Sequence, residues 1–194
     1  MSNDITLAEV QEFIAGFWYN YDQGHFDELA VRIGDEMEYV SRSESGDCPF
    51  EELLKAELHG GAETLAWLTQ HRNENPYPLR HHATNIFRTG VDGPVTNVRF
   101  YLFVNQVTNA VPFAVSSGVV DVGVRRGADG LVFTSMKVVL DADDSVRFVE
   151  YRSASAAARR TSPTMRSHDW NCPKECCWQR SPVIGLIPTT SRSP

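Results

Sequence analysis

The sequence predicts an α+β domain in which N-terminal helices lie across one face of a curved antiparallel sheet. The first observation is that apolar residues recur at helical spacing in two stretches that end by residue 72. The second is that the chain beyond residue 78 is rich in Val, Phe, Thr and Tyr, with Asp-Gly turn signals at 92–93 and 129–130. Helices followed by a run of strands are typical of the α+β class.

The first helix begins at a capping box formed by Thr6 and Glu9. Gly24 suits the left-handed conformation that ends many helices, so we expect this helix to end there. A second short helix follows, with an apolar side that extends from Phe26 to Ile33. The apolar residues of the first helix are Leu7, Val10, Phe13, Ile14, Phe17, Trp18 and Tyr21.

The spacing of apolar residues then changes from that of a strand to that of a helix and back. Residues 37–43 read as a short strand with Met37 and Tyr39 on one face. Residues 50–72 return to helical spacing, and we expect the pair Gly60-Gly61 to divide them into two helical pieces. After a loop at 73–78, four strands are predicted at about 79–89, 94–107, 111–126 and 131–141.

Composition divides the 194 residues into two parts. Residues 151–194 hold seven Lys or Arg against two Asp or Glu, although the whole chain has a net charge of -7. Five of the ten prolines also lie after residue 158. We therefore predict one domain at 1–151 and a Pro/Ser-rich, disordered tail at 152–194.

Three of the four cysteines lie in that tail. His168, Cys172, Cys176 and Cys177 are ligand types that zinc accepts. Structural zinc sites, however, present two well-separated ligand pairs, and these four residues do not, so we predict no metal site and an unstructured tail. Cys48 stands alone in the domain, as expected for a reduced cytoplasmic protein.

Charge and hydropathy exclude several functions. An acidic domain lacks the basic face that nucleic-acid binding requires, so no nucleic-acid partner is predicted. No run of about 18 apolar residues and no signal-peptide pattern is present, so we expect neither a membrane span nor secretion. No phosphate loop, dinucleotide fingerprint or other cofactor motif is found, and no cofactor is predicted.

Asp22 and two adjacent histidines are the polar residues that stand out. Asp22 lies four residues after Trp18, within or beside the apolar stripe of the first helix, where a carboxylate needs hydrogen-bond partners. The alternative is a solvated turn before Gly24. His81 and His82 must face opposite sides of their strand, so one of them faces the helices. Beside a carboxylate it could act as a general base, and the alternative is a structural histidine.

These residues resemble a known family. The segment NYDQGHFDEL at 20–29, the pair Glu38-Tyr39 and the pattern His81-x-x-Thr84-Asn85 are similar to the SnoaL-like division of the nuclear transport factor 2-like superfamily. This division includes scytalone dehydratase, hexachlorocyclohexane dehydrochlorinase and the small subunits of ring-hydroxylating dioxygenases. The resemblance covers residues 5–150 and implies a cone-shaped domain whose curved sheet wraps around the N-terminal helices.

The resemblance also implies roles for individual residues. It pairs Asp22 with His81, places Tyr39 in the pocket and assigns Tyr21 to the position before the aspartate. These four are the predicted catalytic residues. The predicted substrate-binding residues are Phe17, Trp18, Asn85, Trp67 and Phe103.

The function that we infer is that of a small cofactor-independent lyase or isomerase, such as a dehydratase or cyclase, acting on a hydrophobic cyclic metabolite. His81 would remove a proton while Asp22 orients it, and Tyr39 or Tyr21 would bind the oxygen that gains charge. The alternative is a noncatalytic protein of the same fold, either a small subunit of a ring-hydroxylating oxygenase or a ligand-binding module.

The strand at 95–107 is apolar on both faces near its centre. One face presents Val98, Phe100 and Leu102, and the other presents Tyr101 and Phe103. The helices can cover only one face, so we expect a second copy to cover the other and a homodimer or higher homo-oligomer to form.

Overall fold

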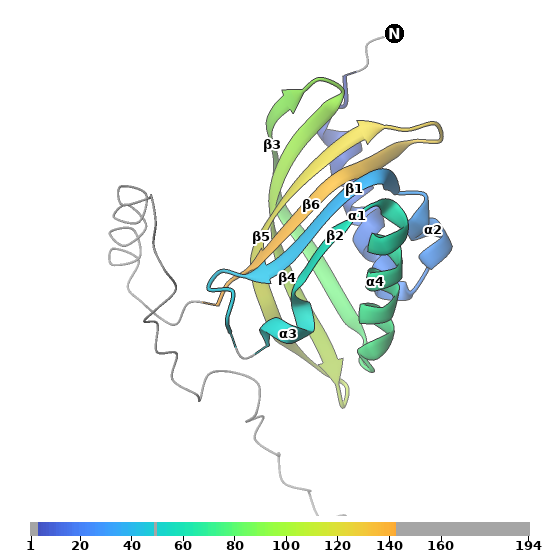
Figure 1. The fold of residues 1–194 in the computed structure, drawn as a ribbon. Coiled ribbons are helices and arrows are strands. Elements are labelled where there is room, and N and C mark those ends of the chain that lie inside the picture. The colour runs from blue at the N-terminus through green and yellow to red at the C-terminus, as the bar shows by residue number, and fades with distance from the viewer. Residues whose placement is uncertain (1–3, 49, 143–194) are drawn as a thin grey trace, which may run out of the picture.

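A sheet of six strands carries helices on one face in the computed structural model, which describes residues 4–48 and 50–142 (Figure 1). The helices are α1 Leu7–Gln23, α2 Phe26–Ala30, α3 Glu51–Leu54 and α4 Gly61–Glu74. The strands are β1 Ile33–Ser43, β2 Ala56–His59, β3 Leu79–Asp92, β4 Val95–Thr108, β5 Val111–Arg126 and β6 Leu131–Leu140. This is the predicted α+β class.

The sheet has the order β2-β1-β6-β5-β4-β3 and is not closed. Strands β3 to β6 form an antiparallel meander, and β2 pairs antiparallel with β1. Strand β1 runs parallel to β6, with Tyr39 opposite Met136. The sheet is therefore mixed: the predicted antiparallel pairing holds for the other four pairs and differs at β1 and β6, because the first long strand lies beside the last described one.

The ends of α1 are those that the sequence predicts. The Thr6 hydroxyl accepts a hydrogen bond from the Glu9 backbone N–H at 3.2 Å, and the Glu9 carboxylate accepts one from the Thr6 N–H at 2.8 Å. Gly24 ends the helix with φ 73°. The Thr6 N–H first, and then the Arg126 guanidinium, lower the pKa of Glu9 to about 2, so the capping carboxylate is ionised at neutral pH.

Two predicted helical stretches differ in the structure. Ile33 is the first residue of β1 rather than part of the second helix. Residues 56–59 were expected to be helical, but they form β2 and pair with β1, Leu58 lying opposite Tyr39. Pairing with the edge of β1 outweighs the local helical spacing. The break at Gly60-Gly61 is confirmed, and Gly61 is needed there because a Cβ would lie 2.6 Å from the Gly34 carbonyl oxygen.

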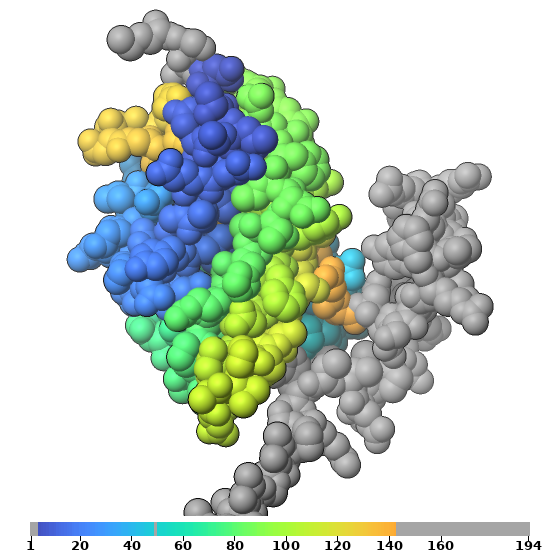
Figure 2. Space-filling model, turned by 180° about the vertical axis from the view of Figure 1, so that it is seen from behind, coloured from blue at the N-terminus to red at the C-terminus, as the bar shows by residue number. Residues whose placement is uncertain are grey.

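The core lies between α1 and the sheet. Phe13 and Phe17 pack on Phe133 of β6, with ring centroids 4.6 and 5.0 Å apart. Helix α1 lies along β3, as the blue and green segments of Figure 2 show. Alternation on β4 gives a buried inner set of Val98, Phe100, Leu102 and Val104, whereas Arg99, Tyr101 and Phe103 face outward. We call the helix-free side of the sheet the outer face.

No helix among residues 4–48 and 50–142 is long and apolar enough to cross a membrane. The predicted boundary at 151, the tail at 152–194 and the residues His168, Cys172, Cys176 and Cys177 lie outside the described residues.

Candidate functional site

Asp22 and His81 meet between α1 and β3. Oxygen Oδ1 of Asp22 lies 2.5 Å from Nδ1 of His81, and Oδ2 accepts a hydrogen bond from the His81 backbone N–H at 2.8 Å. The two side chains are 5% and 10% exposed, so the pair is largely shielded from water. Helix α1 continues to Gln23, which excludes the alternative of a solvated turn at Asp22.

The contact with Asp22 determines which histidine nitrogen can act as a base. A carboxylate only accepts hydrogen bonds, so the Nδ1 of His81 carries the proton that Asp22 binds. The other ring nitrogen, Nε2, then keeps its lone pair, and it makes no hydrogen bond within the described part of the chain. His82 faces the other way and contacts Asn105 on the outer face, with Nε2 2.6 Å from Oδ1.

Aromatic rings hold the imidazole of His81 in place. The indole of Trp18 is stacked on it, with centroids 4.6 Å apart and planes inclined by 9°. Tyr21 approaches it edge to face at 5.2 Å. The indole N–H of Trp18 is buried, and no acceptor for it is found among the described residues. A buried donor without a partner costs about 1–3 kcal/mol.

A second histidine, His71 of α4, lies at the same site. Its Nδ1 is 2.7 Å from the hydroxyl of Tyr21, and its ring is stacked on Trp67 at 4.7 Å. Trp67 in turn contacts Tyr39, with centroids 5.3 Å apart. His71 is not among the residues predicted from the sequence, although its position four residues after Trp67, on the same helix face, is a signal that points to it.

Burial determines which of the side chains around His71 carry a proton at neutral pH. It raises the pKa of Tyr21 and of Tyr39 above the ordinary value of a tyrosine, so both phenols keep their protons at neutral pH. Burial lowers the pKa of His71, and the electrostatic interaction with the nearby imidazole of His81 acts in the same direction. His71 is therefore neutral at pH 7, and one of its ring nitrogens is free to accept a hydrogen bond.

Three of the predicted substrate-binding residues are buried or partly buried near this site, and two are elsewhere. Trp18 and Trp67 touch the histidines, and Phe17 packs edge to face on Trp18 at 5.2 Å. Phe103 is on the outer face, where it is 43% exposed and contacts His82, because the inner positions of β4 are even-numbered. Asn85 is exposed at a bulge in β3 with φ 55°, and this bulge interrupts the alternation that would have turned it inward.

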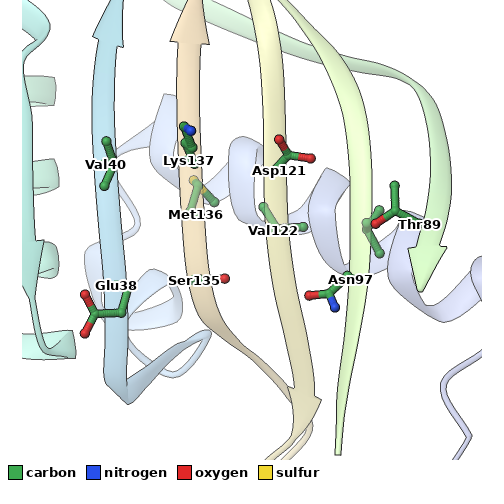
Figure 3. Close-up of a pocket in the computed structure, with 10 residues that line it drawn as sticks. Glu38, Val40, Thr89, Asn97, Asp121, Val122, Ser135, Met136 and Lys137 are labelled. Atoms are coloured by element: carbon green, nitrogen blue, oxygen red, sulfur yellow. The ribbon is translucent and has the colours of Figure 1, made fainter. Parts of the chain in front are cut away.

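A groove of about 350 Å³ lies on the outer face, across the middle of the sheet (Figure 3). Its polar lining includes Glu38, Asn97, Asp121 and Lys137. Asp22 and His81 do not line it, since they lie on the inner face. Within residues 4–48 and 50–142, no group of three or more His, Cys, Asp or Glu side chains is placed to hold a metal ion.

Comparisons with known proteins bear on the fold. The β subunit of benzoate 1,2-dioxygenase from Burkholderia mallei is similar, with a TM-score of 0.60 and 16% identity over 76% of this chain and 98% of that subunit. An NTF2-like protein with a cystatin-like fold from Novosphingobium aromaticivorans has a TM-score of 0.56 and 19% identity over 72% of this chain and 83% of that one. A candidate scytalone dehydratase from the same species has a TM-score of 0.55 and 16% identity over 73% of this chain and 89% of that one.

These likenesses show that the chain has the nuclear transport factor 2-like fold, as its motifs predicted. No family model matches the sequence, and no curated protein matches it. A shared fold does not by itself define an activity, so the function is inferred from the residues of the site.

Proposed function

We propose that this protein is a small cofactor-independent lyase or isomerase that moves a proton on a hydrophobic cyclic metabolite. The observation that carries the proposal is the buried Asp22–His81 pair, in which both carboxylate oxygens are bound by the histidine and Nε2 is left as an acceptor. A carboxylate that fixes the tautomer of an imidazole is a common arrangement for a general base.

In the proposed reaction, Nε2 of His81 removes a proton from a carbon next to a carbonyl group. The electrons of the C–H bond move to the carbonyl oxygen, where a hydrogen bond from Tyr21 or Tyr39 stabilises the negative charge. The enolate then expels a leaving group, which makes the enzyme a lyase, or takes the proton back at another carbon, which makes it an isomerase. The rings of Trp18 and Trp67 favour a flat, apolar substrate.

Deuterium incorporation tests this proposal without knowledge of the leaving group. The protein is incubated in D₂O with a panel of bicyclic aromatic ketones and hydroxy ketones, and exchange of the C–H next to the carbonyl is followed by NMR. We expect exchange with the parent protein and a loss of about 10²–10⁴-fold with His81→Gln, the usual contribution of a general base. His82→Gln is the matched control and should retain the exchange, because His82 is on the outer face. Exchange by His81→Gln at the parent rate contradicts the proposal.

A second candidate function is that of a noncatalytic oxygenase subunit. The likeness to a dioxygenase β subunit over 98% of its length supports it, as do the exposed rings of Tyr101 and Phe103. In that case the protein should copurify with a large iron-bearing subunit when the two are coexpressed, and His81→Gln should leave the activity of the complex unchanged.

We further propose that the outer face packs against a second copy of the chain and that the protein works in the cytoplasm. Tyr101 is 56% and Phe103 43% exposed on neighbouring outward positions of β4, an apolar pair that favours burial in an interface.

A further inference from the structure

Two consecutive residues of α4 contact two consecutive residues of α1 at the candidate site. His71 meets the hydroxyl of Tyr21, and Arg72 meets the backbone carbonyl of Asp22, each across fifty positions of sequence. Both contacts are made by the last turn of α4 to the last turn of α1. The residue that carries the carboxylate of the Asp22–His81 pair is therefore held by α4 as well as by β3.

The contact of Arg72 is a backbone contact rather than an ion pair. Its Nε and Nη2 donate to the Asp22 carbonyl oxygen at 3.2 and 3.0 Å, and its Nη1 donates to the Asn75 carbonyl oxygen at 3.2 Å. The last carbonyl groups of a helix have no partner within the helix, and Asp22 carries one of them. Arg72 satisfies this carbonyl with two hydrogen bonds from a planar, always charged group, which fixes the end of α1 in position and direction.

His71 holds the neighbouring side chain. Its ring cannot turn freely because it is stacked on Trp67, and its Nδ1 meets the Tyr21 hydroxyl. The charged or titratable groups that act on His71 are His81 across the site and Arg72 and Glu74 on its own helix. Because the ring of Tyr21 also touches His81, this contact resists a rotation of α1 that the Arg72 contact alone would allow.

We infer that His71 and Arg72 are positioning residues, which lock the end of α1 so that the Asp22 carboxylate stays on His81. Without this lock the last turn of α1 would be held only by the Gly24 cap and by the contacts of Asp22 with His81, so the carboxylate would have more freedom to move. The catalytic consequence rests on the proposed function, but the geometric claim does not.

The test is an NMR measurement on the free protein. The proton between His81 Nδ1 and Asp22 should give a downfield signal that exchanges slowly with water. In Arg72→Met we expect that exchange to be faster by about tenfold, the effect of losing roughly one net hydrogen bond. Arg72→Lys keeps a donor and should restore most of the protection. Arg80→Met is the matched control: Arg80 is next to His81, and within residues 4–48 and 50–142 its side chain donates a hydrogen bond to the Leu79 carbonyl alone, so the signal should not change.

A second pair of variants covers the case in which Arg72→Met does not fold. His71→Phe keeps a ring against Trp67 and loses the contact with Tyr21, whereas His71→Asn keeps a polar group near the position of Nδ1. We expect faster exchange of the His81 signal in His71→Phe and rescue in His71→Asn. An unchanged signal in Arg72→Met, or in His71→Phe where Arg72→Met does not fold, overturns the inference.

The result separates this inference from the proposed function. If the exchange of the His81 signal is unchanged in the variants but deuterium incorporation still depends on His81, the positioning role is wrong and the base is retained. If the variants speed the exchange but no ketone is deuterated by the parent, the positioning role stands and the enzymatic proposal does not.

Discussion

His71 shows what one buried side chain contributes at the residue scale. The local sequence places His71 on the helix face of Trp67, but it does not show the contact with Tyr21, which is fifty residues away and exists only once α1 and α4 are packed. Its burial disfavours the charged imidazole, and the electrostatic interaction with His81 acts in the same direction.

The stability of the protein should therefore depend on the titration of His71. In the unfolded chain the histidine binds a proton near pH 6.5, whereas in the folded chain its pKa is lowered. Between these two values the unfolded state binds more protons, so the free energy of unfolding falls as the pH drops below about 6.5. We expect urea unfolding at pH 7.5 and pH 5 to show a smaller loss on acidification in His71→Asn than in the parent. An equal loss in both proteins would contradict this.

The two adjacent histidines show how far a residue-scale argument reaches. Alternation predicts that one of His81 and His82 faces the helices, but it does not say which. The Leu79 side chain is 4% exposed, so the odd positions at the start of β3 point inward and His81 goes with them. The rule that odd positions point inward does not hold for Asn85, because the bulge after Thr84 shifts the alternation of inward and outward side chains along β3.

At the scale of elements, the sequence predicts features set by neighbouring residues, such as helix caps and turns. It misses features that depend on the pairing of distant segments. The capping box and Gly24 define α1, the turn at 129–130 separates β5 from β6, and β5 covers 111–126, the range expected from the sequence. Strand β2 was missed because its four residues follow a helical pattern, and only the edge of β1 makes them extended. The groove on the outer face was missed as well, since it depends on the twist of five neighbouring strands.

Gly118 offers a test of the close packing between strands. It lies on β5 opposite Leu140, and a Cβ there would collide with the Val139 carbonyl oxygen and lie 2.9 Å from the Leu140 Cα. Backbone atoms cannot move aside as a flexible side chain can. Gly118→Ala should therefore destabilise the protein by about 1–3 kcal/mol, the usual cost of overpacking.

Gly90→Ala is the matched control for that change, because Gly90 is also on a strand and a Cβ there would meet nothing within 4 Å. Thermal unfolding of the two variants gives the comparison. Equal midpoints for Gly118→Ala and the parent would show that β5 and β6 lie further apart than described.

At the scale of the whole molecule, we expect the protein to self-associate through the exposed rings of its outer face. Tyr101→Lys combined with Phe103→Lys places two charges on the exposed apolar pair, and we expect it to convert a dimer into a monomer. Light scattering at micromolar concentration measures the mass of the parent against the 21.7 kDa of a single chain. The control is Tyr19→Lys, at an equally exposed tyrosine on α1. A monomeric parent would rule out this interface.

The division of the chain at residue 151 stays a prediction at the same scale. A chain that ends at Ala158 should unfold within a few degrees of the full-length protein if the tail adds nothing to the domain, since a loss of 1 kcal/mol lowers the midpoint by only about 2–4 °C in a protein of this size. Loss of folded protein after truncation would show that the domain extends beyond this boundary.

The parallel pairing of β1 with β6 has a consequence for how the protein is made. Strand β1 is synthesised early, but its parallel partner β6, in which Met136 lies opposite Tyr39, is the last of the described strands to leave the ribosome. Until then β1 pairs only with the short strand β2, and Phe13 and Phe17 of α1 lack their contacts with β6. Long-range pairing of this kind slows folding and exposes unpaired strand edges. The nascent chain is thus at its most vulnerable to aggregation just before β6 emerges, when a chaperone would protect it best.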